Sequence, residues 1–233
     1  MKRLLPTLLA DLRLQWRNGF YGVSAFVLIF WALLAGQAWR IDDPSLLPGL
    51  LPGLIAGNML INTFYYMAGL VLLEKGEGTL HAQAVTPLRR SEYLAAKLIS
   101  LAGLSLLENL LVAVLLAGFG LRALPLAAGV LLGSGIYIAA GFITVARFET
   151  INEFLLPSIA VSTLLMLPLL DAFGLWSSPL MVLHPLYSAL LLMKAGFADI
   201  AAWQMAYALL AGLTWLALAI WLSRKTFGRL LGE

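Results

Sequence analysis

The sequence contains no cysteine, only two histidines and few charged residues. The absence of cysteine excludes disulfides, thiolate metal ligands and cysteine nucleophiles. Charged residues make up 12% of the 233 residues, whereas 61% are hydrophobic. A soluble domain has about 25% charged residues, so this chain has too little polar surface to cover a water-exposed globule. The composition therefore predicts an integral membrane protein that contacts lipid, with no nucleic-acid partner.

Several catalytic signatures are also missing. The chain has no Gly-x-x-x-x-Gly-Lys-Ser/Thr loop, so it cannot cradle ATP phosphates in that way. It has no Gly-x-Ser-x-Gly or His-Glu-x-x-His motif and no pair of membrane aspartates. The two histidines, His81 and His184, fall on opposite sides of the membrane in the topology derived below, which argues against a shared metal site. We therefore expect no catalytic residues, no metal and no cofactor in this chain.

Apolar stretches of spanning length recur along the chain and predict an all-α fold. They cover residues 20–39, 48–73, 98–121, 125–146, 154–176 and 201–222. A helix needs about 20 apolar residues to cross a bilayer, so we predict six transmembrane helices in a single transmembrane domain, 1–233. Pro48 and Pro52 predict distorted first turns in the second stretch, and Pro168 predicts a kink in the fifth. The glycines of the fourth stretch permit close helix packing.

Two further segments are helical in pattern but do not fit an ordinary span. In residues 1–18, Leu5, Leu8, Leu9, Leu12 and Trp16 form one apolar face opposite cationic residues. This pattern favours an interfacial helix over a loosely helical charged leader. Residues 177–200 are apolar but interrupted by prolines and polar residues, which predicts a re-entrant or interfacial helical segment on the outer side.

The distribution of Lys and Arg predicts the topology. With both termini in the cytoplasm, only three of the 15 Lys and Arg residues fall on the outer side: Arg40, Arg122 and Lys194. This is a strong positive-inside bias. We therefore expect a multi-pass protein of the inner (plasma) membrane with cytoplasmic termini.

The largest polar segment, residues 74–97, then faces the cytoplasm. Gly76 and Gly78 allow a sharp exit from the second span, and Thr79 is placed to cap a short helix that ends before Pro87. Two interpretations are equally open from the spacing alone. The segment is either a short helix parallel to the membrane, against which a soluble partner can push, or a solvated loop whose Arg89 and Arg90 set the topology.

The run Glu-x-Gly-Glu-Gly-Thr-Leu, followed by Pro-Leu, Glu-Tyr and Lys, resembles the cytoplasmic loop of ABC type-2 exporter permeases. The likeness extends to an N-terminal elbow helix, six spans and an outer helical excursion before the last span. In that family the loop holds a coupling helix that docks on a separate ATPase subunit. The resemblance implies that the coupling element is formed or bordered by Glu74, Glu77, Gly78, Thr79, Leu80, Thr86 and Pro87. His81 departs from the acidic residue common in the family.

A second likeness covers residues 147–158, at the cytoplasmic entry to the fifth stretch. This segment resembles the corresponding stretch of fluoroquinolone export permeases. By position, Arg147, Glu149 and Glu153 would make a second cytoplasmic contact with the ATPase. The resemblance thus implies a P-loop ATPase partner, with ATP and Mg²⁺ bound there, and a second permease copy or homologue.

Glu108 is the one acid near the centre of a span, and Asn109 lies beside it. A charge at the bilayer centre costs roughly 2.5–3.5 kcal/mol on insertion scales, so this side chain should face protein or water. It lines a substrate or proton pathway, or it is a neutral, hydrogen-bonded residue between helices. Asn58 and Asn62 on the second stretch are further pathway candidates.

Three functions follow from these alternatives. The leading one is the permease subunit of an ABC exporter that moves a lipophilic or amphipathic substrate, drugs included. The second is an ATP-independent secondary transporter or channel that uses Glu108, although no internal repeat supports it. The third is a membrane anchor or assembly subunit with no transported substrate.

Overall fold

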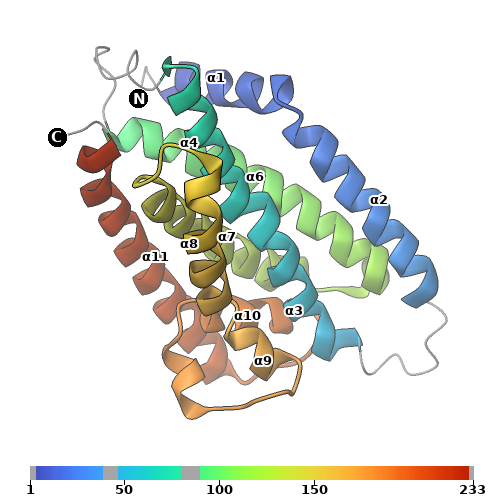
Figure 1. The fold of residues 1–233 in the computed structure, drawn as a ribbon. Helices are drawn as coiled ribbons and strands as arrows, with labels where there is room; N and C mark the ends of the chain where they lie inside the picture. Colours follow the sequence, from blue (N-terminus) through green and yellow to red (C-terminus); the bar gives the residue numbers. More distant parts are fainter. Residues whose placement is uncertain (1–3, 39–46, 80–89, 231–233) are drawn as a thin grey trace.

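The computed structural model describes residues 4–38, 47–79 and 90–230, and these ranges form helices and turns with no strand (Figure 1). Two 3₁₀ turns, Gly118–Gly120 and Pro179–Leu183, join longer helices. The all-helical prediction is confirmed for the described ranges. In chain order the longer elements are α1 (Leu4–Arg17), α2 (Phe20–Ala38), α3 (Leu47–Met59), a π-helical stretch (Leu60–Tyr65), α4 (Tyr66–Gly76), α6 (Arg90–Ala117), α7 (Ala123–Val145), α8 (Ile151–Leu165), α9 (Pro168–Ala172), α10 (Tyr187–Ala195) and α11 (Ala202–Leu230).

Helix α7 lies at the centre of the bundle and contacts α3, α4, α6, α8, α10, α11 and the π-helical stretch. Its glycines permit this close approach. A Cβ atom at Gly141 would lie 2.6 Å from the carbonyl oxygen of Phe64, and one at Gly129 would lie 2.8 Å from that of Ala189. Because only glycine lacks this atom, the neighbouring backbones can touch α7 directly. The predicted close packing of this stretch is confirmed.

The described ranges contain four helices long and apolar enough to cross a membrane, or five if α1 and α2 count as one bent span. The prediction of six spans is not confirmed, because the fifth predicted stretch divides into α8 and α9. Helix α8 has 15 residues, about 22 Å of rise, whereas the hydrocarbon core is about 30 Å thick. The kink predicted at Pro168 is instead a break between two helices, and Pro168 is the first residue of α9, where its missing N–H costs nothing.

The second apolar stretch is distorted at a different place from the one predicted. Helix α3 stays regular through Pro52, and the deviation is the π-helical stretch Leu60–Tyr65. Two features favour a widened turn there. The Thr63 hydroxyl donates to the carbonyl oxygen of Met59, and Gly141 of α7 approaches the backbone at Phe64.

Helix α1 meets α2 at an angle of 63° and crosses one end of the bundle (Figure 1). The exposed positions Leu5 (62%) and Trp16 (76%) belong to the predicted apolar face, so this face is free to contact lipid. A neighbouring face, with the buried Asp11 and Gln15, packs against α6. An elbow helix is therefore present, and its position in the interface stays a prediction.

The segment before the last helix contains the turn Pro179–Leu183 and α10. Helix α10 packs on α7, α11 and α3, and most of its side chains are buried. The described ends of α4 and α11, and the start of α6, lie at the same end of the bundle as α1, whereas α9 and α10 lie at the other end (Figure 1). Helices α1 and α10 therefore lie at opposite ends of the bundle (Figure 1).

Candidate functional site

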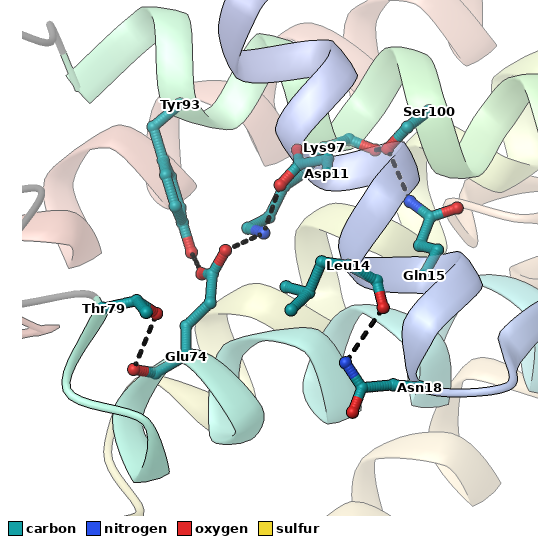
Figure 2. Close-up of polar contacts among 9 residues, drawn as sticks. All are labelled: Asp11, Leu14, Gln15, Asn18, Glu74, Thr79, Tyr93, Lys97 and Ser100. Carbon is teal, nitrogen blue, oxygen red and sulfur yellow. Dashed lines mark hydrogen bonds and ion pairs between the residues drawn. The ribbon is translucent and has the colours of Figure 1, made fainter.

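Four side chains from three helices meet around Lys97 at the α1 end of the bundle (Figure 2). The Lys97 ammonium donates to Asp11 Oδ1 at 3.1 Å and to Glu74 Oε1 at 2.8 Å. The Tyr93 hydroxyl, one helical turn before Lys97, donates to Glu74 Oε2 at 2.6 Å. All four side chains are buried. We call Asp11, Glu74, Tyr93 and Lys97 the Lys97 cluster.

The cluster is stable only as a unit. An unpaired buried ammonium or carboxylate costs several kcal/mol, and the mutual attraction offsets this only when the hydrogen bonds are good. Helical spacing brings the partners together, because Asp11 and Gln15 share one face of α1 while Lys97 and Ser100 share one face of α6. Gln15 Nε2 donates to Ser100 Oγ at 3.0 Å beside the ion pairs. The elbow helix is thus attached to α6 and α4 by polar contacts.

A pocket of about 320 Å³ opens between α1 and the end of α4, next to the cluster. Arg17 and Glu77 line it and form an ion pair at 2.5 Å. Thr79 also lines it, and its hydroxyl donates to the backbone carbonyl oxygen of Glu74 at 3.2 Å. Gly78, between Glu77 and Thr79 in the chain, has a φ of 69°, in the left-handed region that favours glycine.

The predicted docking residues therefore divide into two groups. Glu77 and Thr79 lie at the surface of this pocket, whereas the Glu74 carboxylate is occupied inside the Lys97 cluster. Glu74 thus borders the predicted docking surface and does not present its charge there. Leu80, His81, Thr86 and Pro87 lie outside the described residues.

Lys75 joins the two segments that were predicted to contact a partner. Its ammonium donates to the Phe148 carbonyl oxygen at 2.7 Å and pairs with Glu149 at 3.0 Å. The end of α4 and the α7–α8 connection are therefore adjacent. Arg147 and Glu149 are exposed. Glu153 is also exposed and has a local role, because its carboxylate accepts from the Glu149 backbone N–H at 3.1 Å while Thr150 caps α8.

A second polar cluster lies in the middle of α6. The Asn58 amide of α3 donates to Glu108 Oε1 at 3.0 Å and to Asn109 Oδ1 at 2.9 Å. Asn109 donates to Ser105 Oγ, which accepts in turn from Ser134 of α7 at 2.9 Å. We call Asn58, Ser105, Glu108, Asn109 and Ser134 the Asn58 network.

This network corresponds to the interhelical alternative for Glu108, whose side chain is buried. Glu108 Oε2 has no hydrogen-bond partner among the described residues. Asn62 is not part of the network. It lies in the π-helical stretch, and both polar atoms of its buried side chain are without a partner in the described part of the chain. A pathway role for these residues stays a prediction.

Sequence reasoning did not identify Asp11, Tyr93 and Lys97 as a functional group. One signal was available, because a lysine lies seven residues into a 28-residue, mostly apolar helix and needs a buried partner. The partner itself could not be found from spacing, since Asp11 is 86 residues away. Lys75 was missed in the same way.

The outer surface of the bundle is apolar, with exposed side chains such as Phe26 on α2, Leu156 on α8 and Leu210 on α11. Charged residues gather at the two ends. This arrangement defines a polytopic α-helical membrane protein, and the prediction from composition is confirmed at this level.

Comparison with known proteins gives the family. The model of the fluoroquinolones export permease protein family matches residues 2–233. Two fluoroquinolones export permease proteins of Mycobacterium tuberculosis, from strains CDC 1551 / Oshkosh and ATCC 25618 / H37Rv, are each 34% identical to this chain over 233 residues. The alignments cover 98% of this chain and 96% of each relative. The chain belongs to the fluoroquinolones export permease protein family, and the resemblance noted from its sequence is confirmed.

Proposed function

We propose that this chain is the transmembrane permease subunit of an ABC exporter. A separate P-loop ATPase binds ATP and Mg²⁺ and supplies the work. The observation that supports this most directly is the junction at Lys75, which joins the two predicted docking segments at one end of the bundle. A single partner that binds there contacts the end of α4 and the start of α8 together.

The docking surface in this proposal consists of Glu77 and Thr79 with Arg147 and Glu149. Its mixed charges suit a partner of complementary pattern, which fixes orientation more than it adds affinity. Movement of α4 reaches α6 and α1 through the Lys97 cluster. Glu74 accepts hydrogen bonds from Lys97 and Tyr93 of α6, and Lys97 also donates to Asp11 of α1. Along α6, Glu108 lies 11 residues after Lys97, about 16 Å of helix rise. The Asn58 network then couples α6 to α3 and α7.

Two copies of the chain, or this chain and a homologue, enclose the pathway in the inner (plasma) membrane, with cytoplasmic termini. The apolar faces of α2, α8 and α11 are exposed in the single chain and are available to lipid and to a second subunit. The described helices alone make a thin wall, so a symmetric pair is physically expected.

The substrate class is lipophilic or amphipathic, because the spans carry few buried charges. The relatives are named for fluoroquinolone export, and we propose a fluoroquinolone as the first substrate to test. In this proposal the chain exports drugs from the cytoplasm. The chain itself carries no catalytic residues, because ATP is hydrolysed by the partner.

The test begins with purification of the chain from its native host in mild detergent and identification of the ATPase that co-purifies. Glu77→Lys should remove that ATPase, since it reverses the charge on the docking surface. Asp199→Lys is the matched control. It also breaks a surface ion pair, Arg122–Asp199 at 2.6 Å, but at the opposite end of the bundle, and should retain the ATPase.

Transport in inverted vesicles separates the alternatives. ATP-dependent uptake of a fluoroquinolone that is lost in Glu77→Lys and kept in Asp199→Lys supports the proposal. Uptake that continues without ATP, driven by a proton gradient and abolished by Glu108→Gln, would establish a secondary transporter. Full assembly with the ATPase and no substrate movement under either condition would leave an anchor subunit.

A further inference from the structure

A second pocket, of about 150 Å³, lies at the end of the bundle opposite the Lys97 cluster. It is lined by residues from α3, α9 and α10. Asp171, Tyr187 and Lys194 provide its polar lining.

The two charged residues of this pocket are not neutralised by each other. Among the described residues, neither Asp171 nor Lys194 forms an ion pair, so their charged atoms lie more than 4.0 Å apart. Nearby, Arg122 and Asp199 do pair, at 2.6 Å. Within the described part of the chain, the pocket therefore holds one unpaired charge of each sign.

Tyr187 adds a hydrogen-bond donor. Burial, and then the negative charge of Asp171, raise the pKa of the Tyr187 hydroxyl above its usual value. The hydroxyl consequently keeps its proton at neutral pH. The Tyr187 hydroxyl can therefore donate to an anionic group in the pocket, while Asp171 can accept from a cation.

The walls of the pocket are apolar and held in place by close contacts. Pro52, Pro168 and Leu190 are among the residues that line it. A Cβ atom at Gly53 would lie 2.8 Å from the Phe173 ring, so the segment after α9 packs directly on α3. Since α10 likewise lies against Gly129 of α7, the pocket is formed before any ligand arrives.

We propose that this pocket binds the charged end of a small zwitterionic molecule. The ammonium of the ligand pairs with Asp171, its anionic group pairs with Lys194 and accepts from Tyr187, and its apolar part lies against the proline and leucine walls. A simple cation or anion would leave one of the two protein charges without a partner. A zwitterion satisfies both.

The size of the pocket limits what enters. A cavity of about 150 Å³ accepts one benzene-sized ring, whereas sites for drug-sized ligands measure about 300–1,000 Å³. Only one end of a larger amphiphile therefore fits. The role as an exit-side site for an exported molecule rests on the proposed function, but the binding itself requires no ATPase.

The test uses the full chain in nanodiscs of phosphatidylglycerol, a lipid without a zwitterionic headgroup. Isothermal titration calorimetry compares 4-(aminomethyl)benzoate with benzylamine and benzoate, which each keep one of its charges. We expect the zwitterion to bind about fivefold tighter than either, since each added charge pair contributes up to about 1 kcal/mol at a partly exposed site. Equal binding of the zwitterion and one single-charge analogue would overturn the proposal.

Variants localise the site. Asp171→Asn and Lys194→Gln should each weaken binding of the zwitterion by about fivefold. Binding of benzoate should be unaffected in Asp171→Asn, and binding of benzylamine should be unaffected in Lys194→Gln. Lys194→Arg should restore binding, which distinguishes loss of the site from loss of the fold. Asp199→Asn is the matched control and should bind as the native chain does. Unchanged affinity in both Asp171→Asn and Lys194→Gln would contradict the assignment.

Zwitterionic chemistry is shared by soluble molecules and by phosphatidylethanolamine headgroups. Repeating the titration in nanodiscs that contain phosphatidylethanolamine separates these sources. Weaker binding there identifies the headgroup as the occupant, and unchanged binding identifies a soluble ligand; both outcomes support a zwitterion site. The titration contains no ATPase. If the zwitterion does not bind, the proposed site is wrong, but the proposed permease function is not affected by that result.

Discussion

The Lys97 cluster and the Asn58 network both lie along α6. Each provides partners for buried polar groups, but the kinds of partner differ. At the α1 end, one ammonium is shared by two carboxylates. In the middle of the helix, amide and hydroxyl groups surround a single carboxyl group. Charges are thus paired where the helix begins, and polar groups without opposite charge are used deeper in the span, where a bare charge costs more. The contrast suggests that the first region holds helices in position by ion pairing and the second by hydrogen bonding.

Lys97→Met should have the largest effect, because it leaves the carboxylates of Asp11 and Glu74 buried without a cation. Breaking a buried ion pair in this way costs about 3–5 kcal/mol. Denaturant unfolding of the detergent-solubilised chain measures the loss. In the triple variant with Asp11→Asn and Glu74→Gln, most of the stability should return, since no unpaired charge remains. Native stability of Lys97→Met alone would show that the ion pairs are not what holds α1.

Asn58→Leu should cost less, about 1–3 kcal/mol, the usual penalty for buried groups that lose a hydrogen-bond partner. It removes the donor to Glu108 and Asn109 and the acceptor for the Trp31 indole N–H, at 3.1 Å. The same unfolding assay measures it, with the exposed Asn152→Leu as control. If Asn58→Leu lost as much unfolding free energy as Lys97→Met, the two regions would not differ in how strongly they stabilise the bundle.

Glu108→Gln should be nearly neutral for stability, within about 0.5 kcal/mol. The amide oxygen of glutamine can accept from Asn58 as Glu108 Oε1 does. ATP-driven efflux should persist for the same reason. If efflux is lost while the unfolding free energy is unchanged, Glu108 acts on substrate or protons and not only within the network.

The fold was predictable where one residue determines local structure. Pro168 predicted a kink, and the chain is interrupted there between α8 and α9, while the glycines of α7 predicted close packing. The span count was less predictable, because hydropathy does not show that residues 154–176 divide into two helices. The distortion near Leu60 depends on contacts with α7, which lie far away in the sequence.

The candidate site was predictable in part. The motif around Glu77 predicts a docking segment, which stays a prediction, and the sequence marks Asn58, Glu108 and Asn109 as polar residues in spans. Their mutual hydrogen bonds were not predictable, since Asn58 and Glu108 are 50 residues apart. The pairing of Lys97 with Asp11 and Glu74 depends on the tertiary fold in the same way. Residue spacing within one helix predicts a polar face, but it does not predict which residues of other helices contact that face.

His184 extends the comparison to the opposite end, where a titratable group is held neutral. Its Nε2 lies 3.1 Å from the Leu164 carbonyl oxygen, and its Nδ1 accepts from the Leu186 backbone N–H. Burial lowers the pKa of His184, partly opposed by the Leu164 contact. The neutral His184 ring therefore stabilises the fold above the unfolded pKa of about 6.5. This stabilisation is lost as the pH falls through the pKa of His184 in the folded chain.

We expect this pH effect on stability to be smaller than the losses in Lys97→Met and Asn58→Leu. Melting temperatures at pH 7.5 and pH 5.5 measure it, and His184→Gln isolates it, because the variant lacks the titration while other groups are unchanged. The native chain should lose more stability on acidification than His184→Gln. An equal loss in both would mean that His184 does not contribute.

The docking surface can be tested most directly by cross-linking, because the chain has no cysteine of its own. A single Cys at Glu149 or at Asp199 carries a maleimide-linked photoreactive group, and the assembled complex is then illuminated in native membranes. We predict that the ATPase is captured from Glu149→Cys and not from Asp199→Cys. Capture from Asp199→Cys, or from neither position while the ATPase remains bound, would show that the partner does not dock at the Lys75 junction.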